Sequence, residues 1–156
     1  IIIEGMARYR RKEKVFKIKG NAISGYGMYA KWDLPKGTIL FQGEEKAQRI
    51  VTKKFVDENW DEREKLNFRR YAYPISKDVY ILWDLQPEEW SPQNHHCDAN
   101  CSYIGLNVVI NRAVKKGEEL TLDYGSFLDE TMEPFNCNCG SSNCRGLIKG
   151  NAGNKI

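Results

Sequence analysis

The chain has no apolar run long enough to span a membrane, no internal repeat and no low-complexity tract. A helix that crosses a bilayer needs about 20 mostly apolar residues, so a helical membrane protein is excluded. No secretory signal is visible either. We therefore expect an intracellular protein with no membrane partner, located in the nucleus if the source is eukaryotic and in the cytoplasm if it is bacterial.

Cysteine is absent before Cys97, and the cysteines all lie in two short stretches, NHHCDANC and CNCGSSNC. Their odd number weakens the interpretation as a disulfide framework. Three of them, Cys137, Cys139 and Cys144, form a CxCx4C cluster. Thiolates spaced this closely in a reduced chain favour a zinc site over a disulfide or free buried thiols.

A structural zinc ion has four ligands, so the three clustered thiolates need a fourth from elsewhere in the fold. The candidates all lie in the NHHCDANC stretch: Cys97, Cys101, His95 and His96. The tail that contains these three cysteines is too short to bury a core of its own. A metal shared in this way would hold it against the NHHC segment. It would also bring Asn94 and the DYG turn into one neighbourhood.

The 156 residues are 41% apolar, 29% charged and 12% aromatic. This composition is ordinary for a globular protein, and the length suits one domain with a real core. The opening is unusual, because an apolar triplet, Glu4 and Gly5 precede Met6. We expect residues 1–5 to be an added sequence with the native start at Met6, and residues 1–14 to form an N-terminal arm.

Charge is divided unevenly along the chain. Residues 1–83 hold 18 Lys and Arg against 11 Asp and Glu, whereas residues 84–133 hold 3 against 10. The acidic stretch contains the NHHC and LDYG segments, so a site there would lie in a negative field that attracts a basic, lysine-containing peptide. An ordinary solvated face is the alternative interpretation.

The basic run from Arg8 to Lys19 could contact nucleic acid or an acidic patch on chromatin. Only Tyr9 and Phe16 are aromatic within it, and no nucleic-acid-binding module accompanies it. A solvated arm that leads into the first strand is the favoured interpretation, with weak nucleic-acid contact as the alternative.

Short apolar patterns predict a mainly β fold with short helices, in the α+β class. Strands are expected at residues 15–19, 38–41, 79–83 and 106–110, with a shorter one at 119–123. Residues 52–68 place Phe55, Val56, Trp60 and Leu66 on roughly one face, which predicts a single amphipathic helix capped by Thr52. The result is one domain with a helical insert at about residues 52–70 between two strand-rich halves.

Five short motifs follow one another in a specific order: GxG at residues 25–27, FxGE at 41–44, NHxCDxNC at 94–101, GEELTxDYG at 117–125 and CxCGxxxCRG at 137–146. Together they resemble the SET-domain protein lysine methyltransferases with a post-SET zinc tail, over residues 19–150. The resemblance implies several small β-sheets, a C-terminal pseudoknot, and S-adenosylmethionine and a substrate lysine that enter from opposite faces. It also implies a SET domain at 15–130, a post-SET zinc segment at 131–150 and a tail at 151–156.

The resemblance assigns a cofactor site and a metal site. The cofactor site comprises Gly25, Tyr26, Gly27, Asn94 and His95, where the glycines let the backbone approach the ligand closely. The fourth zinc ligand would be Cys97, beside Cys137, Cys139 and Cys144, and Cys101 would be a small buried hydrophobe. His96 and Ala99 replace the usual Ser and Pro, which alters the loop on the cofactor side.

Methyl transfer to a lysine depends on alignment and on a neutral amine. A free lysine has a pKa near 10.4, and an apolar aromatic channel lowers it by desolvation. By resemblance, Tyr124 is the catalytic residue, whose hydroxyl orients the amine. The channel wall is expected at Phe41, Tyr71, Tyr73, Leu122 and Phe127. Phe41 and Leu122 stand where the family commonly has Tyr and an aromatic residue, which predicts a wider and less polar channel.

We therefore expect a zinc-stapled, S-adenosylmethionine-dependent protein lysine N-methyltransferase, with histone tails as the leading substrate class. One alternative is the same enzyme acting on a non-histone protein. The other is a catalytically silent peptide-binding module, motivated by Phe41 and the altered NHHC loop. The intact Tyr124, Asn94 and His95 favour the enzyme.

Overall fold

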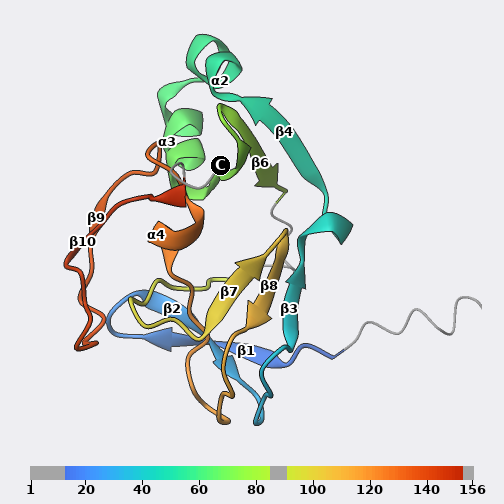
Figure 1. Ribbon diagram of the computed structural model, residues 1–156, viewed down its shortest axis with the longest axis vertical. Helices are drawn as coiled ribbons and strands as arrows, with labels where there is room; N and C mark the ends of the chain where they lie inside the picture. Colours follow the sequence, from blue (N-terminus) through green and yellow to red (C-terminus); the bar gives the residue numbers. More distant parts are fainter. Residues whose placement is uncertain (1–12, 85–90, 153–156) are drawn as a thin grey trace, which may run out of the picture.

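The computed structural model describes residues 13–84 and 91–152 (Figure 1). The expected added sequence at residues 1–5, most of the N-terminal arm and the last four residues of the tail lie outside the described residues. The part of the basic run that precedes Glu13 also lies outside them.

The strands of the described ranges form four small antiparallel sheets, which confirms the mainly β class. Two sheets are strand pairs, β1-β2 and β10-β9, and two have three strands, in the orders β3-β8-β7 and β4-β6-β5. The strands are β1 (Phe16–Asn21), β2 (Gly25–Ala30), β3 (Ile39–Gln42), β4 (Gln48–Thr52), β5 (Tyr73–Ser76), β6 (Val79–Trp83), β7 (Cys101–Ile104), β8 (Asn107–Ile110), β9 (Phe135–Asn136) and β10 (Leu147–Ile148). The expected strands at 15–19, 38–41, 79–83 and 106–110 are thus confirmed as β1, β3, β6 and β8.

The helices of the described ranges are short. They are the 3-10 turn η1 (Gly43–Glu45) and the α-helices α2 (Lys53–Asn59), α3 (Glu62–Tyr71) and α4 (Tyr124–Phe127). None of them is long and apolar enough to cross a membrane.

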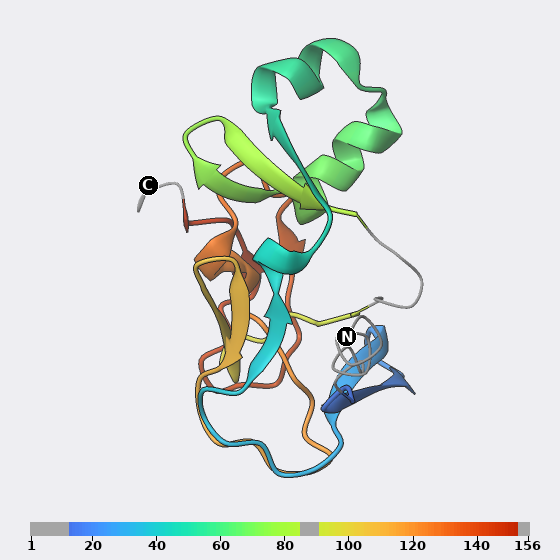
Figure 2. The same ribbon diagram turned by 90° about the vertical axis from the view of Figure 1, so that its right-hand side faces the viewer.

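Residues 48–83, from β4 to β6, are called the insert module below. Its sheet and the helices α2 and α3 lie at the top of Figure 1, and Figure 2 shows the helices against one side of that sheet. The two layers enclose a small core of buried side chains: Val56, Phe68, Ala72, Tyr80 and Leu82. The β1-β2 pair lies at the opposite, lower end of the molecule.

The main core lies in the lower half, between the β1-β2 pair, the β3-β8-β7 sheet and the chain that leads into α4. Its most buried members include Ala30, Ile110 and Leu120, each 0% exposed. A third cluster fills the cysteine tail, as residues 128–152 are called below, and includes Leu128, Met132 and Ile148. Tyr124 and Phe127 pack against both of these clusters, so α4 joins the main core to the cysteine tail.

The single helix predicted for residues 52–68 is wrong. Thr52 does cap a helix, because its Oγ1 accepts a hydrogen bond from the Phe55 amide at 3.1 Å. The chain then becomes extended at Trp60, and Asp61 starts a second helix. The Asp61 carboxylate accepts from the Glu64 amide at 2.8 Å, and the Glu64 carboxylate accepts from the Asp61 amide at 3.0 Å. This capping box divides the apolar pattern into two helices.

The strand predicted at residues 119–123 is also wrong, since this segment forms only isolated bridges. The Leu122 amide donates to the Asn94 carbonyl and the Leu122 carbonyl accepts from the His96 amide, both at 3.0 Å. On the other side, the Cys101 amide donates to the Thr121 carbonyl at 3.0 Å. The segment therefore lies between two earlier parts of the chain and pairs regularly with neither.

Candidate active site and metal centre

Four cysteine side chains converge where the cysteine tail meets the NHHC segment. The sulfur atoms of Cys97, Cys137, Cys139 and Cys144 all lie within 4.8 Å of one another, and the Cys97 and Cys137 sulfurs are 3.9 Å apart. A tetrahedral zinc ion with Zn–S bonds of about 2.3 Å separates its sulfurs by about 3.8 Å. The four-cysteine cluster therefore fits a zinc site.

The other candidates for the fourth ligand lie elsewhere. Cys101 is 2% exposed in the main core, as expected for a small buried hydrophobe, and burial raises the pKa of its thiol to about 12. His96 uses its Nδ1 to accept a hydrogen bond from the Asp98 amide at 3.0 Å. His95 is the neighbour of the cluster, with its Nε2 3.4 Å from the Cys97 sulfur.

The thiols of the cluster show why a metal suits them. Burial raises the pKa of Cys137 to about 12, so without a cation this thiol keeps its proton. Burial also acts against ionisation of Cys139, but hydrogen bonds from the backbone amides around it outweigh burial and lower its pKa to about 6. A divalent cation would replace the protons and hold all the sulfurs as thiolates.

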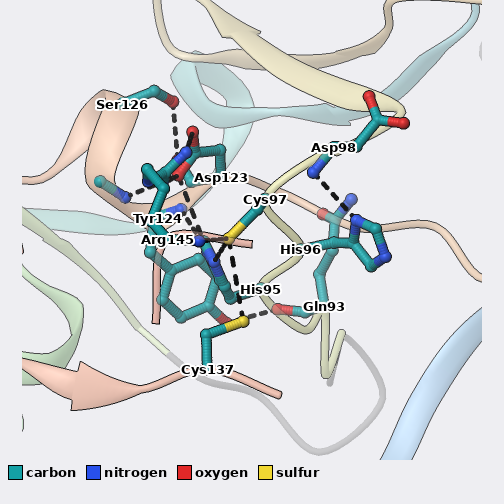
Figure 3. A network of polar contacts seen from close by, with 11 residues as sticks. Gln93, His95, His96, Cys97, Asp98, Asp123, Tyr124, Ser126, Cys137 and Arg145 are labelled. Atoms are coloured by element: carbon teal, nitrogen blue, oxygen red, sulfur yellow. Dashed lines mark hydrogen bonds and ion pairs between the residues drawn. The ribbon is translucent and has the colours of Figure 1, made fainter. Parts of the chain in front are cut away.

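Arg145 connects the metal centre to the DYG turn (Figure 3). Its backbone amide donates to the Cys97 sulfur at 3.4 Å, and its guanidinium binds both carboxylate oxygens of Asp123, with Nη1 and Oδ2 3.0 Å apart. Asp123 is the N-cap of α4 and accepts from the Gly125 amide at 3.1 Å. The cysteine tail therefore holds the residue that immediately precedes Tyr124.

His95 holds Tyr124 from the other side. The Tyr124 amide donates to His95 Nδ1 at 3.1 Å, so Nδ1 carries no hydrogen and the Nε2 hydrogen faces the Cys97 sulfur. Burial lowers the pKa of His95, although the Asp123 carboxylate opposes this, and the ring is therefore neutral near pH 7. The Tyr124 hydroxyl donates to the Gln93 carbonyl, and burial raises its pKa to about 12.

A first cavity of about 600 Å³ lies between the β1-β2 turn, the NHHC segment and the cysteine tail. The amide nitrogen of Asn94 lies in it, 2.7 Å from the Tyr26 carbonyl and 2.8 Å from Glu119 Oε1. Gly27 packs against that same Glu119 oxygen, since a Cβ there would lie 2.4 Å from it, but Gly27 is not among the residues that line this cavity.

A second cavity of about 480 Å³ is more aromatic. The aromatic residues that line it are Tyr26, Phe41, Tyr71, Tyr73, Trp83, Tyr103, Tyr124 and Phe127. The Tyr103 and Phe127 ring centroids are 4.7 Å apart, and the Tyr73 and Tyr103 centroids are 4.8 Å apart. Both cavities are lined by Ser24, Arg70, Tyr71, Asn94 and Tyr124. The two cavities therefore meet beside Tyr124.

The structure brings most of the expected site residues to these cavities. Asn94 and His95 line the first, and all the expected channel residues, Leu122 included, line the second. Tyr26 lines only the second cavity, and its carbonyl accepts from the Asn94 side-chain amide. Gly25, with φ of +83°, turns the chain into β2, and neither Gly25 nor Gly27 lines either cavity.

Four functional positions escaped the sequence reasoning: Trp83, Tyr103, Glu119 and Arg145. Trp83 ends the apolar run at residues 79–83, which predicts a strand but not that this side chain lines a cavity. Tyr103 lies two residues after the buried Cys101 on β7, so the two-residue period of a strand could have indicated its direction. For Glu119 and Arg145 the sequence carries no local signal, since their partners Asn94 and Asp123 are 25 and 22 residues away.

The sequence model of the SET domain matches residues 25–125, which is more than half of the chain and contains both the GxG turn and Tyr124. The chain belongs to the SET-domain family of protein lysine methyltransferases. Members of this family use S-adenosylmethionine, and the four-cysteine cluster that follows the matched region is consistent with a post-SET zinc site.

Relatives of this SET-domain chain include histone-lysine N-methyltransferases from animals and plants. The ash1 enzyme of Drosophila melanogaster is 28% identical over 137 residues, covering 83% of this chain and 6% of the relative. Enzyme 2D of Homo sapiens is 27% identical over 151 residues, covering 89% of this chain and 3% of the relative. ASHR3 of Arabidopsis thaliana is 30% identical over 147 residues, covering 88% of this chain and 29% of the relative. The chain thus spans only a small part of each relative's length.

The first cavity fits the family's cofactor. Its volume of about 600 Å³ lies in the range of about 300 to 1,000 Å³ that is usual for small-molecule sites. Its wall offers polar groups at Asn94 and Ser24 and an opening toward the aromatic cavity beside Tyr124.

Proposed function

We propose that this SET-domain enzyme methylates a lysine side chain in a histone tail. The observation that carries the proposal is the meeting of a polar cavity and an aromatic cavity beside Tyr124. S-adenosylmethionine supplies the methyl group. A donor in the first cavity and a lysine in the second would face each other at that junction, as an in-line transfer needs. A histone substrate also implies a nuclear location.

In this proposal Tyr124 is the catalytic residue. Its backbone is held by His95 and by the capped turn of Asp123, and its hydroxyl already donates a hydrogen bond at the junction. That hydroxyl would orient the lysine amine. The aromatic walls formed by Tyr73, Tyr103 and Phe127 would desolvate the amine and favour its neutral form.

Asn94 and His95 line the first cavity and would bind the cofactor. The family resemblance assigns the GxG turn, residues 25–27, to the cofactor as well, although none of these residues lines the first cavity. Phe41, Tyr71 and Leu122 would complete the channel with the aromatic walls. Residues 15–130 would form the SET domain and residues 131–150 the post-SET segment. Support for a histone substrate comes from the relatives, which are histone-lysine N-methyltransferases, and from the acidic stretch at residues 84–133.

The direct test is a methyl-transfer assay with zinc-loaded protein, mixed core histones and a whole-cell lysate, read by mass spectrometry. Methyl-lysine on a histone tail is the expected product. Tyr124→Phe should lower kcat while the Kd of the cofactor barely changes, because the lost hydrogen bond is used mainly in the transition state. Methylation confined to non-histone proteins would overturn the substrate, and a fully active Tyr124→Phe enzyme would overturn the role of Tyr124.

The pH profile provides a second test of the neutral-amine mechanism. Lysine loses its proton as pH rises, so the rate at saturating cofactor should climb between pH 7 and 9 by up to about tenfold per unit. Tyr124 stays a neutral donor over this range, since burial raises its pKa to about 12. His95 stays neutral as well, because burial lowers its pKa. A flat profile in single-turnover measurements would contradict deprotonation as part of the limiting step.

A further inference from the structure

The charges around the first cavity are arranged asymmetrically. Two carboxylates, Glu119 and Glu133, line it, and Arg70 is the one Lys or Arg among its described lining residues. Arg70 lies in the last turn of α3, and its side chain is exposed. It forms neither a hydrogen bond nor an ion pair with any residue that the structure describes.

The neighbouring cations are engaged in other contacts. Lys65 pairs with Glu62 at 3.4 Å, and Arg49 pairs with Asp84 at 3.6 Å. Arg69 does not line the cavity, and its carbonyl accepts from the Glu133 amide at 3.2 Å. Within this part of the described chain, only Arg70 combines an unpaired charge with a place on the cavity wall.

The cofactor of the family carries an α-carboxylate, which needs a donor or a cation. Glu119 and Glu133 would repel it, and the Asn94 amide nitrogen already contacts Glu119 and the Tyr26 carbonyl. A guanidinium, in contrast, presents paired N–H groups that match a carboxylate. The position of Arg70 on the wall therefore suits this group.

The short methionyl chain of the cofactor also limits where its carboxylate can lie. Three single bonds join the sulfonium of the cofactor to its α-carbon, so the carboxylate lies only about 5 Å from the sulfur. The sulfonium has to present its methyl group where the two cavities meet, beside Tyr124. The partner of the carboxylate must therefore lie near that junction, and Arg70 is one of the few residues that line both cavities.

We infer that Arg70 binds the α-carboxylate of S-adenosylmethionine and thereby fixes the methionyl end of the cofactor at the junction of the two cavities. The inference rests on the proposed function, since it places the methyl donor in the first cavity. It makes α3 of the insert module, rather than only the GxG turn and the NHHC segment, a part of the cofactor site.

The test is a binding cycle that removes the Arg70 guanidinium and the α-carboxylate of the cofactor separately. Isothermal titration calorimetry on zinc-loaded wild-type protein and on Arg70→Met would use S-adenosylmethionine and its decarboxylated analogue, which lacks only the α-carboxylate. Arg70→Met should weaken binding of the full cofactor by about tenfold or more, as for a hydrogen-bonded charge pair. It should leave the affinity for the decarboxylated analogue almost unchanged.

Matched variants make the result specific. Arg69→Met removes an adjacent arginine outside the cavity and should leave both affinities unchanged, whereas Arg70→Lys should restore part of the loss because it keeps the charge. Equal weakening of both ligands by Arg70→Met would overturn the inference, as would no weakening of either. If the binding cycle behaves as expected but no histone is methylated, the proposed substrate fails and the role of Arg70 stands.

Discussion

The insert module and the cysteine tail are held together by different forces. The insert module buries Phe68 and Tyr80 against each other, with ring centroids 4.8 Å apart, within a core that it builds largely from its own residues. The cysteine tail has two strands of two residues each, and its cluster includes Cys97 from another part of the chain. Apolar burial thus orders the first region, whereas the second combines a small apolar cluster with cysteine ligands from two parts of the chain.

This difference matters for the site because the tail holds the residues on both sides of Tyr124, while His95 and Gln93 hold Tyr124 itself. Arg145 of the tail binds the Asp123 carboxylate, and the Gly125 carbonyl accepts from the Asn151 amide at 3.0 Å. Gly150 packs so closely on the chain before it that a Cβ there would lie 1.7 Å from the Asp129 carbonyl oxygen. A metal that orders the tail would therefore also order the catalytic turn.

The largest expected effect is that of metal removal. Structural zinc sites contribute apparent binding free energies on the order of 10 kcal/mol or more, so chelation should disorder the chain from Phe135 onward and abolish turnover. Hydrogen exchange measured by mass spectrometry should show lost protection in the tail and at residues 123–127. Protection in the insert module should remain, because its core contains no metal ligand.

Two cysteine variants serve as matched controls for this experiment. Cys139→Ala should reproduce the effect of chelation, whereas Cys101→Ala, outside the cluster, should still bind zinc. Absence of zinc by elemental analysis, or full activity of Cys139→Ala, would contradict the metal-dependent tail. Simultaneous loss of protection in the insert module would show that the two regions are not independently ordered.

Phe68→Ala should have the next largest effect and act on the other region. Phe68 is 3% exposed, and truncation of a buried Phe costs about 3 to 5 kcal/mol through lost burial and the remaining cavity. The free energy of unfolding, measured by urea denaturation of zinc-loaded protein, should fall by about that amount. Phe55→Ala, at a position 50% exposed on α2, is the control and should cost far less.

Zinc affinity distinguishes this variant from the cysteine variants. Phe68→Ala should leave the zinc Kd of the folded protein unchanged, since none of the metal ligands contacts the insert core. A large loss of zinc affinity in Phe68→Ala would refute the division of the molecule into an apolar region and a metal-held region.

Short patterns in the sequence correctly predicted the features that depend on residues close together in the chain. The spacing of Cys137, Cys139 and Cys144 indicated the metal, and Thr52 indicated a helix start. The sequence also carries a local signal for the helix break at Asp61, because Asp61 stands three residues before Glu64 as in a capping box. The apolar pattern over residues 52–68 led to the prediction of one helix instead. Here a short capping signal outweighed the periodicity of the whole segment.

What depends on tertiary contacts could not be predicted. Residues 119–123 alternate like a strand, yet they lie between the NHHC segment and β7, where each neighbour offers only isolated bridges. Arg70 looks like any charged residue on an amphipathic helix, and only the fold places it on the wall of a cavity that Asn94 also lines. The resemblance supplied Cys97 and Tyr124, but it could not supply the contacts between Arg145, Asp123 and His95 that hold Tyr124.

The smallest expected effect concerns the contact that joins the two regions. The Tyr80 hydroxyl of the insert module donates to Asp129 Oδ2 at 2.7 Å, and burial raises the pKa of Tyr80, so it stays a donor at all ordinary pH values. Asp129 is 5% exposed, and its other oxygen accepts from the amide and the hydroxyl of Thr131. Tyr80→Phe leaves one buried carboxylate oxygen without its donor, which should cost about 1 to 3 kcal/mol in zinc-loaded protein.

The same substitution should cost less in the chelated protein, because Gly150 covers Asp129, and Asp129 becomes hydrated when the chain from Phe135 onward is disordered. Urea denaturation of wild type and Tyr80→Phe, each with and without zinc, measures this coupling as a double cycle. Tyr73→Phe is the matched control, since its hydroxyl donates to the Gly105 carbonyl at 2.9 Å, outside the tail. An equal cost with and without zinc would mean that Asp129 stays buried when residues 135–152 are disordered, and the Tyr80 contact would then be independent of the metal.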